Sequence, residues 1–435
     1  MNQSLIIRFP GIKIPKIELS WTNICLAIML ICGLCVGILP KPLTVLPVLA
    51  CSVALVATRG IWMAFPIMIF YYESFGMFFG LSVYRYFSLL FFMFVILNCP
   101  KIPVKLSHVV PLFIFLIYCI IVVSPENMQR AVFAFFDVMN MSLLVTCFLN
   151  STDALKKFFR FYVLVALCAF VTGLVFNRTH VTEYYLGGKL VEVARNYGTF
   201  EDPNYMGLFY SVALFAMMSL SLFRPIVRAV LAVTLSIMIL SSLSITALVT
   251  NLIFWLVYLF IYRKINLITL CCIVLAFLAL FSLYSYSLEN PDTPIIGMLS
   301  LRVEEKLDSL SSGDVGDVTS NRTDLSAYHW DYFCNQSVVK MLFGMNAASI
   351  FKTNLDGFTS AAHNEYIDLL LNIGFLGALV YLGIILSRTV EMFIRVRCYG
   401  DTYSGCIFML KVIWFAYAAT LTMFGDYRFM LLFFI

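Results

Sequence analysis

The chain has 435 residues, of which 62% are hydrophobic and only 12% are charged. Soluble globular proteins carry about 25% charged residues, and the apolar runs here reach the roughly 17–25 residues that a membrane-spanning helix needs. Composition therefore excludes an ordinary soluble domain and predicts an all-α polytopic membrane protein with about 12–14 transmembrane helices. The formal net charge of +5 comes from basic residues spread along the chain, so we expect no nucleic-acid partner.

Apolar segments in chain order predict the helices, and basic residues predict their orientation. The segments are 21–39, 43–58, 61–80, 85–98, 108–123, 131–149, 161–176, 207–223, 229–243, 246–262, 265–287, 364–386 and 405–424. With the N-terminus in the cytoplasm, the positive-inside rule is met by six connections, at Arg59, Lys101/Lys105, Lys156/Lys157/Arg160, Arg224/Arg228, Arg263/Lys264 and Arg388/Arg395/Arg397. Lys41, Arg85 and Arg130 are exceptions on the other side.

This orientation divides the chain into six parts. They are a cytoplasmic N-terminus (1–20), N-terminal transmembrane helices (21–176), a first motif loop on the non-cytoplasmic side (177–206), central transmembrane helices (207–287), a large loop on the same side (288–363) and C-terminal transmembrane helices (364–435). Loops as long as the second one are usually functional or disordered. Its apolar stretch at Val338–Phe343 and the aromatic residues before it predict short helices lying on the membrane face.

The 13 cysteines lie mostly inside apolar segments, where cysteine acts as a small hydrophobic residue. Their spacing matches neither a disulfide framework nor a zinc motif. We therefore expect no metal and no cofactor.

Three polar clusters on the outer side could carry chemistry. The first runs from Arg195 to Asn204, with Gly198 and Pro203 shaping a turn. Arg195 would lie at the membrane surface, where it could equally contact a lipid headgroup. The second begins at Arg322, whose planar guanidinium suits phosphate oxygens, although an ion pair within the loop is an alternative.

The third cluster opens the apolar segment at 364–386. Thr359 or Ser360 is the predicted N-cap, which would put His363 and Asn364 in the first helical turn. The positive end of the helix dipole disfavours an imidazolium, so His363 would stay neutral and could accept a proton. A histidine that only bridges the loop and the helix by hydrogen bonds is the alternative.

Taken in order, the three clusters resemble the O-antigen ligase/polymerase superfamily of bacterial membrane glycosyltransferases. The family pattern of His, then Asn, Ser or Gln, nine residues and Gly-x-x-Gly is matched by His363, Asn364, Gly374 and Gly377. The pattern Arg-x-x-Gly-x-Phe ending in Pro-Asn is matched by Arg195, Gly198, Phe200, Pro203 and Asn204. The Arg…Trp…Gly pattern of the large loop is matched by Arg322, Trp330 and Gly344. One departure is the turn at 242–246, which lacks the arginine that family members often carry there.

The resemblance implies transfer of a sugar chain from undecaprenyl diphosphate to an acceptor hydroxyl, at the periplasmic face of the bacterial inner (cytoplasmic) membrane. Arg195 and Arg322 would stabilise the departing diphosphate, and His363 would deprotonate the acceptor in a metal-independent, inverting displacement. The candidate substrate-binding residues are Asn364, Tyr197, Asn204, Trp330 and Asp368. The implied partners are an undecaprenyl-diphosphate-linked oligosaccharide, membrane lipid and a chain-length regulator protein.

Three activities compete. We favour a repeat-unit polymerase, which joins lipid-linked units into O-antigen or capsular polysaccharide, because the Phe-, Ile-, Cys- and Asn-rich composition is associated with surface-polysaccharide gene clusters. An O-antigen ligase, with lipid A–core as acceptor, shares the same motifs. A lipid-linked glycan transporter would need ionisable residues along several spans. The spans here contain few of them, namely Glu73, Asp137 and Asp426.

Overall fold

The computed structural model describes residues 20–98, 128–176, 179–186, 189–196, 198–262, 322–345, 354–355, 358–359 and 363–421, together with positions 114, 117, 282, 285, 286, 304, 311, 428, 431 and 432. The predicted helices 108–123 and 265–287 lie outside these residues, apart from isolated positions. Asp426, Tyr197 and the predicted N-cap Ser360 also lie outside them.

The described part of the chain is mainly helical, with thirteen α-helices. They are α1 (Trp21–Leu34), α2 (Lys41–Ala57), α3 (Phe65–Phe75), α4 (Val83–Asn98), α6 (Met128–Leu143), α7 (Thr152–Val175), α8 (Pro203–Ser219), α9 (Pro225–Ser241), α10 (Ile245–Tyr262), α14 (Arg322–Cys334), α15 (Val338–Phe343), α16 (Glu365–Tyr399) and α17 (Thr402–Ala418). A 3₁₀ turn, Ile61–Ala64, precedes α3, and a π-helical turn, Leu144–Phe148, follows α6. The short helices predicted in the large loop correspond to α14 and α15.

Local capping explains where several helices begin. Ser20 and Ser151 cap α1 and α7 through hydrogen bonds from the backbone N–H three residues ahead. The Asp202 carboxylate accepts from Asn204 N at 2.6 Å, and Pro203 occupies the first turn of α8. This helix therefore starts four residues before the predicted boundary at 207, because the cap and the proline belong to the polar motif rather than to the apolar run.

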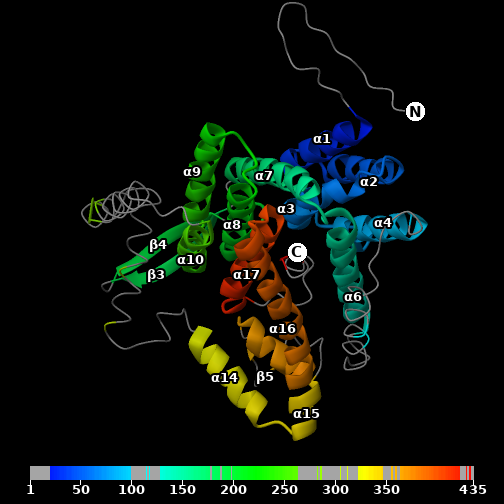
Figure 1. Ribbon diagram of the computed structural model, residues 1–435. Coiled ribbons are helices and arrows are strands. Elements are labelled where there is room, and N and C mark those ends of the chain that lie inside the picture. Colours follow the sequence, from blue (N-terminus) through cyan, green and yellow to red (C-terminus); the bar gives the residue numbers. More distant parts are fainter. Residues whose placement is uncertain are drawn as a thin grey trace, which may run out of the picture.

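Helix α8 forms the centre of the bundle (Figure 1) and is buried along nearly its whole length. It packs against α7, α9, α10 and α17, and α17 in turn packs against α16. Helices α14 and α15 lie to one side of this bundle and join it through contacts with α16. The segment that carries the large-loop motif is therefore attached to the helix that carries the histidine motif.

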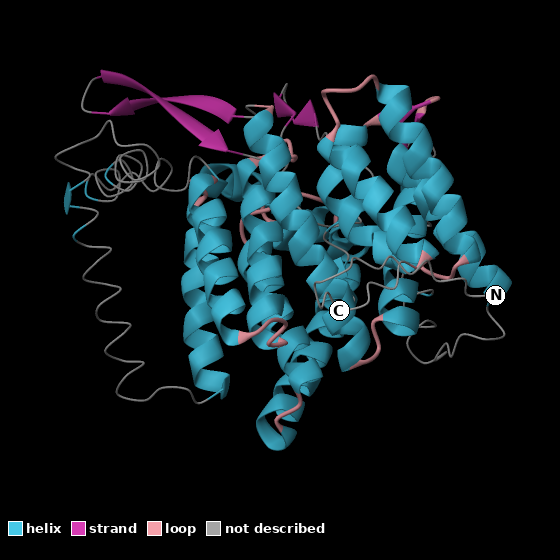
Figure 2. Cartoon of the chain, turned by 90° about the horizontal axis from the view of Figure 1, so that it is seen from above, coloured by secondary structure: helices cyan, strands magenta, loops and turns pink. Residues whose placement is uncertain are grey.

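Three antiparallel strand pairs interrupt the predicted all-α class. They are β1 (Met77–Phe78) with β2 (Leu81–Ser82), β3 (Thr179–Leu186) with β4 (Lys189–Asn196), and β5 (Asn354–Leu355) with β6 (Phe358–Thr359). The β3–β4 hairpin falls in the first motif loop, for which the sequence analysis predicted no strands. In Figure 2 the strands lie along one edge of the view, beyond the same ends of the helices.

Two of the described helices, α7 and α16, are long and apolar enough to cross a membrane. A further eight apolar helices have 10–17 residues, which corresponds to about 15–26 Å against a hydrocarbon core of about 30 Å. Helix α16 is interrupted at Gly374, whose φ of 67° and ψ of 179° are not helical.

Candidate functional site

Two motifs meet at a contact between two glycines. Gly344, which ends α15, has φ 92°, and a Cβ built there would lie 2.8 Å from Gly374 N and closer still to the Asn372 carbonyl oxygen. A Cβ on Gly374 would lie 2.5 Å from the Leu342 carbonyl oxygen. A backbone hydrogen bond from Met345 N to Leu371 O, 2.9 Å long, also joins the two segments. Only glycine on both sides allows the backbones to approach so closely, so the large-loop motif and the histidine motif are joined here.

The histidine lies one residue outside α16. His363 is exposed and has φ 50°, and Asn364 is the N-cap, with its Oδ1 accepting from Tyr366 N and Ile367 N. The prediction that Thr359 or Ser360 caps the helix is therefore wrong, since Thr359 pairs in β6 instead. The helix dipole acts within the first turn, so its effect on His363 is weaker than expected. The exposed position leaves the imidazole reachable by a substrate.

Two acidic residues sit in the first turn of α16. Glu365 and Asp368 are buried, with 0% and 3% of their surface exposed, and Tyr381 OH donates to Glu365 Oε1 at 3.4 Å. The Tyr381 and Tyr366 rings both pack near Trp414 of α17. These carboxylates are fixed within the protein rather than directed to solvent, so they are suited to orient the start of α16.

The structure places the two candidate arginines on different elements. Arg195 is in β4, opposite His180 of β3, and Arg322 is the first residue of α14. Trp330 lies two turns further along α14 and is 47% exposed, with its ring 6.0 Å from that of Phe333. An exposed indole on this helix can offer a flat apolar surface to a saccharide.

Asn204 has both ends of its amide engaged. Its Nδ2 donates to Asp202 Oδ1 at 2.8 Å, and its Oδ1 accepts from Ser244 Oγ at 2.7 Å. Ser244 lies in the α9–α10 turn, where the family arginine is missing. This turn therefore contacts the first motif through a serine hydroxyl, and Asn204 is held by the protein itself.

The rest of the first motif is packed against α3 and α7. Thr199 Oγ1 donates to the Phe70 carbonyl at 2.5 Å, and the buried Phe200 ring stacks on Phe209. A Cβ on Gly173 of α7 would lie 2.5 Å from Gly198 Cα. The motif is thus a rigid structural corner, whose polar end leads into the β3–β4 hairpin and Arg195.

A buried ion pair next to this corner was not predicted. Arg428 Nη1 lies 2.5 Å from Glu73 Oε1, with side chains 7% and 8% exposed. The guanidinium also lies over the rings of Tyr72 and Tyr205, at 5.3 and 5.1 Å. Because the two residues are far apart in sequence, only the apolar setting of Glu73 could have hinted that it had a partner.

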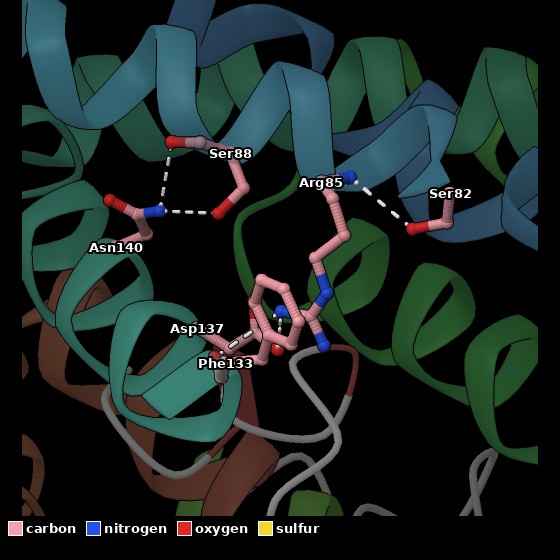
Figure 3. Close-up of polar contacts among 6 residues, drawn as sticks. All are labelled: Ser82, Arg85, Ser88, Phe133, Asp137 and Asn140. Atoms are coloured by element: carbon pink, nitrogen blue, oxygen red, sulfur yellow. Dashed lines mark hydrogen bonds and ion pairs between the residues drawn. The ribbon is translucent and has the colours of Figure 1, made fainter. Parts of the chain in front are cut away.

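A second polar seam joins α4 to α6 (Figure 3). Arg85 Nη1 lies 2.6 Å from Asp137 Oδ2, and Asn140 Nδ2 donates to Ser88 Oγ at 2.6 Å one turn further along both helices. The spacing of three residues on each helix puts both contacts on one face. Asp137 was recognised as an ionisable residue in a span, but its partner was not.

The sequence analysis did not propose two further buried groups as site residues. Lys411 of α17 is fully buried and donates to the Leu432 carbonyl at 2.9 Å. His329 of α14 is 2% exposed; its Nδ1 lies 2.7 Å from the Leu325 carbonyl, and no group in the described part of the chain hydrogen-bonds to its Nε2. The lysine could have been found as a charge within the segment 405–424.

Comparison of the chain with protein-family models and with curated protein sequences found no match. The resemblance to the O-antigen ligase/polymerase superfamily therefore rests on the motif residues alone.

Proposed function

We propose that the chain is a multi-pass glycosyltransferase of the bacterial inner membrane, which joins undecaprenyl-diphosphate-linked oligosaccharide repeat units into O-antigen or capsular polysaccharide. The observation that carries this proposal is the backbone contact between Gly344 and Gly374. Two motifs recognised separately along the chain share one junction in space, as parts of one site would. Chance matches to short patterns have no reason to meet in this way.

The outward faces of the helices support a membrane location. On α9, Ile226, Val230, Val233 and Ile237 follow one helical face and are 80%, 60%, 62% and 50% exposed. Helix α10 exposes Val249, Leu252, Leu256 and Phe260 in the same manner. Apolar stripes of this length are costly in water and favourable in lipid, which supports several spans beyond the two longest helices.

The proposed chemistry divides the polar residues into two roles. Arg195 and Arg322 stabilise the diphosphate as the glycosidic bond breaks, because charge grows on the leaving oxygen. His363 accepts the proton of the attacking hydroxyl, a role for which its exposed position before α16 is suited. Asn364 then serves chiefly to start α16 and so to hold His363 in place.

The ion pairs argue against a transporter. The carboxylates of Glu73 and Asp137 each bond an arginine at 2.5 and 2.6 Å, so each pair is neutral and held in place. A transport path would need groups that change partner or charge during the cycle. Paired residues of this kind instead fix neighbouring helices to each other.

Gel profiles of surface polysaccharide test the proposal in a strain that lacks the gene, with and without a plasmid copy. A polymerase predicts lipid A–core with a single repeat and no ladder in the deletion strain, restored by the plasmid. Bare lipid A–core with polymer left on the lipid carrier would instead identify the ligase. An unchanged ladder in the deletion strain would reject both activities.

A further inference from the structure

Arg85 is held in a fixed orientation by three groups. Its Nη1 donates to Asp137 Oδ2 at 2.6 Å and to the Phe133 carbonyl at 3.2 Å. The guanidinium carbon also lies 4.6 Å from the centre of the Phe133 ring. The Asp137 side chain is 1% exposed, so its carboxylate is held in place by the surrounding protein and keeps the guanidinium in one orientation.

Both of these hydrogen bonds use Nη1, and neither uses the edge of the guanidinium that Nε and Nη2 form. Within the described part of the chain, Nε and Nη2 of Arg85 make no hydrogen bond, and in Figure 3 the other terminal nitrogen points away from Asp137. The side chain is 21% exposed. Two parallel N–H donors on one rigid edge match two oxygens of a phosphate group.

The position of Arg85 selects the source of the phosphate. It lies in the first turn of α4, directly after the β1–β2 pair, and the strands gather at one end of the bundle (Figure 2). Arg85 was an exception to the charge bias of the connections, which puts most basic residues at the opposite end. An arginine just inside the apolar helix can reach the level of lipid headgroups.

We infer that the free edge of Arg85 is a binding site for the phosphate of a membrane lipid at the outer surface. Asp137 orients the guanidinium, and the ion pair that they form is neutral overall. Binding is therefore selective for paired oxygens but remains reversible. Tyr84 and Tyr72, whose rings are 6.0 Å apart, connect this site to Arg428 and Tyr205, beside the first motif. The site stands independently of the proposed transfer reaction.

Lipid-dependent thermal stabilisation of the purified full-length chain in dodecyl maltoside tests the site. Undecaprenyl phosphate and phosphatidylglycerol are the probes, and dioleoylglycerol, which lacks a phosphate, is the comparison lipid. The wild-type chain should be stabilised by phosphate-bearing lipid only. Arg85→Lys keeps the charge and the pair with Asp137 but lacks the second edge, so its apparent affinity should fall about tenfold.

Ser88→Ala is the matched control, because it weakens the same seam and leaves the guanidinium untouched; its affinity should equal that of the wild type. If Arg85→Lys destabilises the ligand-free chain, the pair replacement Arg85→Met with Asp137→Leu removes both charges and should lose the phosphate dependence. Stabilisation by both probes indicates a site for lipid phosphates in general. Stabilisation by undecaprenyl phosphate alone indicates a site for the polyprenyl carrier lipid. Equal affinity of Arg85→Lys and wild type, or equal stabilisation by dioleoylglycerol, would overturn the inference.

Discussion

Gly344 and Gly374 are constrained by space rather than by chemistry. Each has a positive φ, and each would place a Cβ against the backbone of the other segment. Their presence in the two motif patterns could be read from the sequence, but nothing local indicated that they touch. A glycine is needed at each of these two positions because the segment that packs on it leaves no room for a Cβ.

Gly344→Ala should therefore destabilise the chain by about 2–5 kcal/mol, because the new Cβ combines backbone strain with overpacking. Thermal melting of the purified protein in detergent measures this. Gly383→Ala is the control, at a position in α16 where a Cβ would meet nothing within 4 Å. That variant should melt like the wild type or slightly higher. Equal melting temperatures for the two variants would mean that the glycine contact does not hold α15.

His363→Ala should reduce sugar transfer by about 10²–10⁴-fold in a purified, folded protein, since it removes the proposed general base.

Arg322→Lys should reduce the rate of sugar transfer about 10²-fold, because one ammonium cannot replace the bidentate fork of the guanidinium. The assay uses lipid-linked oligosaccharide extracted from the deletion strain. Asn335→Ala, an exposed change at the end of α14, should remain active. An active His363→Ala protein would rule out the base.

Among the elements, helix existence was easier to predict than helix boundaries. Every predicted apolar segment that lies in the described residues contains a helix. The boundaries moved where a polar cap extended a helix beyond its apolar run, as Asp202 does for α8 and Ser151 for α7. The β3–β4 hairpin was missed because its tyrosines and valines alternate with polar residues over only eight positions per strand, next to much stronger helical signals.

The start of α17 gives a pH-dependent prediction. Burial raises the pKa of Asp401, but hydrogen bonds from the Ser404 hydroxyl and from the backbone N–H groups of Ser404 and Tyr403 outweigh it, so the pKa is lowered. A depressed folded-state pKa means that this cap stabilises the chain above the unfolded pKa of about 3.9 and that the benefit is lost as pH falls through the folded value.

Asp401→Asn keeps a good N-cap without a titrating group, so its melting temperature should change less between pH 6 and about pH 3 than that of the wild type. Asp401→Ala should lose about 1 kcal/mol at neutral pH. Melting curves across this range compare the three proteins. Parallel pH profiles for wild type and Asp401→Asn would show that the carboxylate has no role in acid sensitivity.

For the whole molecule, orientation in the membrane is the property on which the proposed function depends. The large-loop segment and the C-terminal end of α16 should face opposite sides. Two exposed cysteines report on them, Cys334 at the end of α14 and Cys398 near the end of α16. Both are native residues, so no new side chain is needed.

Chains that retain only Cys334 or only Cys398 should label differently with a membrane-impermeant maleimide. In spheroplasts, Cys334 should react directly, and Cys398 should react only after the membrane is permeabilised. The reverse result would place the proposed site in the cytoplasm, away from a periplasmic lipid-linked donor. Equal labelling of both in intact spheroplasts would contradict a membrane between them.

The sequence by itself determined the helical class, the approximate position of most helices and the order of the three motifs. These features follow from local patterns of apolar and polar residues, which act over a few turns. Tertiary structure alone decided the contacts between Gly344 and Gly374, between Arg85 and Asp137, and between Arg428 and Glu73. The two ion pairs join residues 52 and 355 positions apart. Such partners are chosen by which helices pack together, because a buried charge is stable only beside the one group that neutralises it, and no local pattern records that choice.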